Sequence, residues 1–122
     1  MSEVSDIRAA MQAKDEARRR KVLDSFRDLG ARILPPGSRL WLYGSQARGE
    51  ATADSDWDLL IIVDKAKREL YDDFDRWGYP FVDLGIDWGE SVSAIIYTRV
   101  EWEHSSFTPF HKNVERDKIE LL

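Results

Sequence analysis

Two aspartates, Asp56 and Asp58, stand two positions apart at the start of an apolar run. In a β-strand, alternate side chains point to the same face, so the two carboxylates would share one face while Trp57 points to the other. Carboxylates held this close repel each other unless a cation lies between them. Mg²⁺ suits such a pair, because it takes oxygen ligands and completes its shell with water and substrate phosphates. The spacing therefore predicts a metal-binding pair, although Asp-x-Asp also recurs elsewhere in the chain and is weak by itself.

A glycine and a serine precede this pair at a distance that gives it a context. Gly44 and Ser45 follow a short apolar segment, and ten residues separate Ser45 from Asp56. Glycine lets the backbone approach a ligand closely, and the turn after it can present N–H groups to phosphate oxygens. If Ser45 opens a helical turn, Arg48 lies three residues on and would face the same phosphates. We expect one strand end to bind a triphosphate and the next strand start to hold the metal.

The elements that would position these residues alternate between helical and extended patterns. Helical spacing of apolar residues predicts helices over 6–29 and 65–77, and Thr108-Pro109 predicts a last short helix with proline near its start. Strands are predicted over 39–43, 57–63 and 91–98, and the continuous apolar run of 57–63 indicates burial on both faces. Residues 79–88 fit either a strand or irregular helix. This order predicts an α+β fold with a small mixed sheet packed against helices.

The segment YGSQARGEATADSDWDLL (residues 43–60) carries Gly-Ser, ten intervening residues and Asp-x-Asp. It resembles the signature of the polymerase-beta-like nucleotidyltransferase superfamily, and in particular its minimal members, the MNT proteins. The resemblance is specific over this segment and compatible in layout over most of the rest.

The resemblance implies a fold, a reaction and a partner. Members of the superfamily transfer a nucleoside monophosphate, here AMP from ATP, to a hydroxyl and release pyrophosphate. Asp56 and Asp58 would hold two Mg²⁺ ions, which orient the triphosphate and lower the pKa of the attacking hydroxyl. Gly44, Ser45 and Arg48 would bind the nucleotide. Some members this short are antitoxins that add AMP to a tyrosine of a HEPN-type ribonuclease toxin, which implies a protein partner.

Active members usually carry a third carboxylate on a neighbouring strand. Asp83 fits the expected apolar-Asp-apolar pattern if residues 81–87 form a strand, and Asp87 and Glu90 are the next choices. The clearest downstream strand, 91–98, contains no acid. If that strand is the neighbour of Asp58, the third ligand is missing, and Asp83 and Asp87 become ordinary surface acids.

Composition limits the function further. The 122 residues match one domain spanning 1–122, and the absence of cysteine excludes disulfides, Cys-ligated zinc and thiol catalysis. The net charge of −5 disfavours a long polynucleotide substrate, because nucleic-acid binders carry a basic footprint. The N-terminus lacks signal-peptide features, and no apolar run reaches the roughly 20 residues that span a bilayer. We therefore expect a cytoplasmic protein without membrane association.

Two other functions compete with the transfer of AMP to a partner. The first is a degenerate module that neutralises its partner by contact alone, which the acid-free strand 91–98 favours. The second is a small-molecule transferase of the aminoglycoside type, which the missing acceptor-binding domain disfavours. Without that domain, the acceptor must be presented by a partner or within an oligomer.

Overall fold

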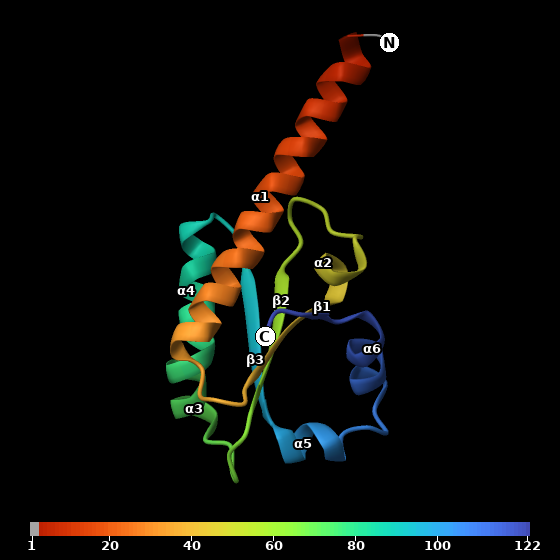
Figure 1. Cartoon of the computed structure of the whole chain (residues 1–122). Coiled ribbons are helices and arrows are strands. Elements are labelled where there is room, and N and C mark those ends of the chain that lie inside the picture. The colour runs from red at the N-terminus through yellow and green to blue at the C-terminus, as the bar shows by residue number, and fades with distance from the viewer. Residues whose placement is uncertain (1–2) are drawn as a thin grey trace.

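The computed structural model describes residues 3–122 and is built around a four-stranded sheet in the order β3-β2-β1-β4 (Figure 1). The strands are β1 (Arg39–Tyr43), β2 (Trp57–Val63), β3 (Val92–Thr98) and β4 (Ile119–Glu120). β1 pairs antiparallel with β2 and with β4, whereas β2 pairs parallel with β3. The mixed sheet and its covering helices confirm the predicted α+β class. The two-residue β4 was not predicted, because so short a strand leaves no periodic pattern.

Different helices cover the two faces of the sheet (Figure 1). On one face, α1 (Glu3–Ile33) and α4 (Tyr79–Asp87) cover the larger core, which includes Phe26, Leu59 and Phe81. On the other face, α5 (Arg99–His104) and α6 (Pro109–Asp117) pack over a smaller core around Leu60 and Trp102. Six of the seven residues of β2 are buried, as its continuous apolar run predicted.

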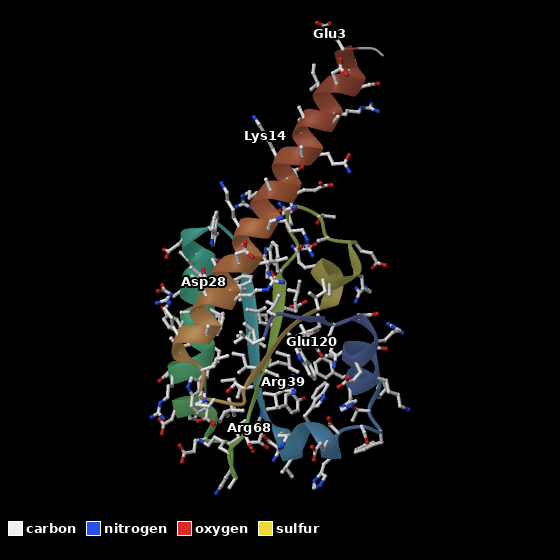
Figure 2. All side chains as sticks on the ribbon, viewed as in Figure 1. Glu3, Lys14, Asp28, Arg39, Arg68 and Glu120 are labelled. Carbon is white, nitrogen blue, oxygen red and sulfur yellow. The ribbon has the colours of Figure 1, made fainter. Side chains whose placement is uncertain are left out.

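Helix α1 is longer than predicted and divides into two halves. Its buried residues all lie in the second half, from Val22 to Gly30, where the helix packs on the sheet. Residues 3–18 are exposed, and the helix projects beyond the body of the molecule (Figure 1). The apolar side chains Val4, Ile7 and Met11 are each more than half exposed. Figure 2 shows side chains of this projection, including the labelled Glu3 and Lys14, extending away from the sheet. Within residues 3–122, no helix is both long enough and apolar enough to cross a membrane.

The connection from β2 to β3 contains α3 (Leu70–Asp73), the π-helical segment η1 (Phe74–Gly78) and α4. The helix predicted over 65–77 begins five residues later, at Leu70. Asp73 holds the preceding residues 65–69 outside the helix by accepting hydrogen bonds from Lys65 and Glu69. The buried Asp73 carboxylate accepts hydrogen bonds from the Glu69 backbone N–H at 2.8 Å and from Lys65 Nζ at 2.9 Å. Burial alone would raise the pKa of Asp73, but these two donors outweigh it and the pKa is lowered.

The strand alternative for residues 81–87 is wrong, because these residues form α4. Two parallel strands need a crossover connection, and a helix is the usual one. Pro80 is the second residue of α4 and follows η1 directly, so the residue that lacks an N–H lies where the π-helical pattern gives way to the α-helix. Gly85 lets the helix pack closely on β3, since a Cβ at this position would overlap the Val92 side chain.

The C-terminal elements agree with the sequence. β3 begins one residue later than the predicted strand 91–98 and ends with it. Thr98 caps α5 by accepting from the Glu101 N–H, and Thr108 caps α6 by accepting from the His111 N–H. Both caps satisfy backbone donors that a helix start leaves unpaired. They fix α6 against the same end of the sheet as the Gly-Ser segment.

Candidate active site

The two halves of the Gly-Ser and Asp-x-Asp motif meet where β1 and β2 lie side by side. β1 ends at Tyr43, which is paired with Asp58 across the antiparallel strands. Gly44 follows in the left-handed conformation, with φ of 72°, and opens the five-residue helix α2 (Gly44–Arg48). A Cβ at Gly44 would overlap the Asp58 carboxylate oxygen Oδ2. Glycine is therefore required here both by the backbone conformation and by the close approach of the Asp58 carboxylate.

The carboxylates of Asp56 and Asp58 lie at the start of β2. Successive side chains of a strand point to opposite faces, and Trp57 and Leu59 point into the larger core. The Asp58 side chain therefore lies on the sheet face covered by α5 and α6, where it is half-buried. Asp56 precedes the strand and is exposed. The pKa of Asp58 is raised by burial and then by the charge of Asp56, while the charge of Arg48 lowers it. The two carboxylates are thus close enough to repel each other, and a divalent cation would relieve that repulsion.

Asp56 and Asp58 suit Mg²⁺, because proteins often hold this ion by one or two carboxylates together with substrate phosphates. The absence of a side chain at Gly44 leaves space beside them. Among residues 3–122, however, no group of three or more His, Cys, Asp or Glu side chains is arranged to hold a metal ion. The oxygen ligands beyond Asp56 and Asp58 would then come from water and from a bound triphosphate.

Arg48 ends α2 and faces the same region. Its Nε donates to Glu50 Oε2 at 3.0 Å, and its Nη1 lies 3.7 Å from Asp117 Oδ2 on α6. A hollow of about 200 Å³ adjoins it, lined by Tyr43, Gly44, Arg48, Phe110, Asn113, Val114 and Asp117. Sites for drug-sized ligands span about 300–1,000 Å³, so the hollow holds only part of a nucleotide. The α6 residues were not identified from the sequence, because nothing in 109–117 indicates that this helix packs beside Gly44.

The strand next to Asp58 carries no third carboxylate. β3 is the parallel neighbour of β2, and Ser93 is the residue in register with Asp58. Asp83, predicted as a tentative third acid, lies on α4 over the opposite face of the sheet, and its side chain is exposed. Asp87 is exposed at the end of the same helix, and Glu90 forms an ion pair with Arg18. Asp83 is not brought to the carboxylate pair, because its segment forms the crossover helix rather than a strand.

The aromatic residues beside the motif have packing roles. Tyr43 is half-buried with its ring edge-on to Phe110, and its pKa is raised to about 12 by burial, then by Asp58 and Tyr97. It therefore stays neutral at physiological pH. Trp57 is 3% exposed and points into the larger core, as predicted. His111 stacks on Trp102 and thereby belongs to the packing of the smaller core.

Comparison with known proteins identifies the family and the fold of this chain. The family model described as "Nucleotidyltransferase domain" matches residues 19–120. No curated protein matches the chain. A solved structure described as "Crystal structure of the toxin-antitoxin with AMP-PNP" has a similar fold, with a TM-score of 0.59 and 15% sequence identity over 82% of this chain and 72% of that chain. The family match covers most of the chain, including β1 to β4 and both halves of the motif, and the chain therefore belongs to the nucleotidyltransferase domain family.

Proposed function

We propose that this protein binds ATP with magnesium and transfers AMP to a hydroxyl acceptor. The observation that carries the proposal is the close approach of the Asp58 carboxylate to Gly44, which brings the Gly-Ser turn beside the carboxylate pair in a chain of the nucleotidyltransferase family. Gly44 and Ser45 would bind phosphate oxygens through backbone N–H groups and the serine hydroxyl. Asp56 and Asp58 would hold magnesium, and Arg48 would neutralise part of the triphosphate charge.

In the reaction, the acceptor oxygen would form a bond to the α-phosphorus of ATP, and the bond from that phosphorus to the leaving pyrophosphate would break. The acceptor proton would pass to solvent, because Ser93 rather than a carboxylate stands level with Asp58. Magnesium, when bound, would neutralise the triphosphate and lower the pKa of the acceptor hydroxyl. The chain's own contribution would be positioning and charge stabilisation, as in other phosphoryl-group transfers.

We further propose that the acceptor is a tyrosine of a protein partner, a HEPN-type toxin, which would make this chain an antitoxin. The resemblance of residues 43–60 to MNT proteins supports this, as does the similar fold found in a toxin-antitoxin structure with AMP-PNP. The projection of α1 adds a physical argument. A helix without tertiary contacts is marginal in water, and Val4, Ile7 and Met11 form an exposed apolar stripe on it. A partner that covers this stripe would stabilise the projection.

A second candidate is neutralisation of the partner by contact without transfer. Ser93 favours it, because the strand beside Asp58 offers a hydroxyl where active relatives would need an acid. The two candidates differ in whether the carboxylate pair is required. Transfer needs Asp56 and Asp58, whereas contact needs only the folded surface.

The test is transfer of label from ATP carrying ³²P at the α-phosphate, incubated with the protein, Mg²⁺ and a lysate of the source cells. The wild type is expected to label a protein band, and the folded Asp56→Asn/Asp58→Asn variant is expected to label none. Label on a tyrosine, shown by mass spectrometry, would support the toxin acceptor. Suppression of the partner by the double variant, with no labelled product from the wild type, would instead establish the contact module.

A further inference from the structure

One side chain of α1, Arg19, contacts both halves of the candidate site. Its Nη1 donates to Gln46 Oε1 at 2.9 Å, and its Nη2 donates to the Gln46 backbone oxygen at 2.7 Å. Gln46 is buried, with 7% of its surface exposed, and it is the third residue of α2, directly after Gly44-Ser45. The planar guanidinium thus binds α2 through two parallel hydrogen bonds, a geometry that a lysine ammonium does not reproduce.

The same guanidinium also lies over the Trp57 ring, with its central carbon 5.5 Å from the ring centroid. Trp57 is 3% exposed and stands between Asp56 and Asp58 in the chain. Cation–π contacts of this kind favour a fixed relative position of cation and ring. Arg19 therefore connects the residue that follows the Gly-Ser turn with the residue that separates the two carboxylates.

Apart from Arg19, α2 is held by Ala47, which packs against the larger core, and by Arg48, which pairs with Asp117 on α6. The helix has five residues, and no side chain caps its start. A hollow of about 370 Å³ lies between α1 and the loop after α2, and Arg19, Gln46 and Trp57 all contribute to its lining. At the edge of this hollow, the two hydrogen bonds of Arg19 are the side-chain bonds that tie α2 to α1.

We propose that Arg19 is a positioning residue, which holds α2 against β2 and thereby fixes Ser45 and Arg48 relative to the Asp56–Asp58 pair. The inference rests on the proposed nucleotide site, because its functional consequence is the geometry of triphosphate binding. It assigns to α1 a role in the site that the motif over residues 43–60 does not contain.

The experiment compares Arg19→Lys with Arg20→Lys, the same substitution at the exposed neighbouring arginine. ¹⁵N relaxation without nucleotide measures the order of the amides of residues 45–48. In wild type and Arg20→Lys, order parameters of about 0.85 are expected, whereas in Arg19→Lys they should fall toward about 0.6. In calorimetry, the dissociation constant for Mg·ATP should rise about tenfold in Arg19→Lys only. Circular dichroism and urea unfolding establish that each variant is folded under these conditions.

A second variant approaches the contact from the other side. Gln46→Met removes the side-chain acceptor and keeps similar volume, so its effect should overlap with that of Arg19→Lys in a double-mutant cycle. If Arg19→Lys does not fold, Gln46→Met alone decides through the same two measurements.

The outcomes distinguish failure of the positioning role of Arg19 from failure of the proposed nucleotide binding. Unchanged order parameters, or lost order with unchanged Mg·ATP affinity, would overturn the positioning role. If Arg19→Lys lowers the order parameters of residues 45–48 but the wild type binds no Mg-nucleotide, the positioning of α2 by Arg19 would stand and the proposed function would be overturned instead.

Discussion

The two strands that flank β2 differ at the level of Asp58. On the β1 side, Tyr43 leads into Gly44, whose missing side chain admits the Asp58 carboxylate. On the β3 side, Ser93 occupies the position in register with Asp58. To the first side we assign binding of the metal-bound triphosphate under the proposed function. The second lacks the carboxylate that would bind a further metal or accept a proton from the acceptor. Under the proposed function, nucleotide binding would depend on the β1 side and acceptor activation on the β3 side, where Ser93 and no carboxylate is in register with Asp58.

On the β1 side, the largest effect is expected from Gly44→Ala. The new Cβ would displace the Asp58 carboxylate, and the left-handed backbone would be strained. We expect Mg·ATP affinity to fall on the order of 10- to 100-fold, because a lost interaction of a charged group is worth about 1.5–3 kcal/mol and each 1.4 kcal/mol is tenfold in affinity. Gly37→Ala is the matched control, because Gly37 has φ of 83° and open space around its Cα.

Both substitutions should cost about 1–2 kcal/mol of unfolding free energy from the backbone conformation, and Gly44→Ala should cost more. Urea denaturation and calorimetry measure the two effects. Equal loss of nucleotide affinity in both variants would show that the close approach to Asp58 is unimportant.

On the β3 side, Ser93→Asp would introduce the carboxylate that this strand lacks. A carboxylate in register with Asp58 should increase the affinity for Mn²⁺ or Mg²⁺ on the order of tenfold, because affinity for hard cations rises with ligand charge. Without metal, the additional negative charge should destabilise the fold, and metal should restore the melting temperature. Ser106→Asp, in the exposed turn between α5 and α6, is the control. Metal titrations followed by melting would show no difference between the variants if Ser93 does not face the carboxylate pair.

The repulsion between the carboxylates predicts a dependence of stability on pH. Because burial and Asp56 raise the pKa of Asp58 in the folded state, ionisation of Asp58 opposes folding. This penalty is absent when the carboxyl is protonated and develops as pH rises from the ordinary aspartate value of about 4 through the raised pKa.

Asp58→Asn should therefore be more stable than wild type at pH 7, and the difference should disappear toward pH 3. Urea midpoints across this range measure it, with the exposed Asp54→Asn as control. A variant less stable than wild type at pH 7 would contradict the repulsion.

The smallest effect is expected at Asp83. Its carboxylate is exposed on α4, over the face of the sheet opposite to Asp58. Asp83→Asn should change Mg·ATP affinity by less than about twofold and should leave stability nearly unchanged, as for other surface substitutions. A tenfold loss of affinity in calorimetry would return Asp83 to the site.

The elements around residues 43–60 could be predicted from the sequence because local rules decide them. Glycine after an apolar strand and alternation along β2 are properties of a few neighbouring residues. The α+β class and strands 39–43, 57–63 and 91–98 followed from periodicity in the same way.

The identity of the residue next to Asp58 on β3, and the contacts that α1 and α6 make beside residues 43–60, depend on long-range packing. Whether Asp83 or Ser93 lies next to Asp58 was decided by the crossover, since residues 81–87 cover the sheet as a helix. Likewise, no local pattern reveals that Arg19 reaches Gln46, or that Asn113 lies beside Gly44.

The most direct test of the central claim is calorimetric titration of ATP with and without Mg²⁺. The wild type is compared with Asp56→Asn/Asp58→Asn and with Asp83→Asn/Asp87→Asn, which removes the same number of charges from exposed positions on α4. We expect saturable, magnesium-dependent binding in the wild type and in the α4 variant, and none in the motif variant. Equal binding by the folded motif variant, or no binding of any nucleoside triphosphate by the folded wild type, would contradict the claim.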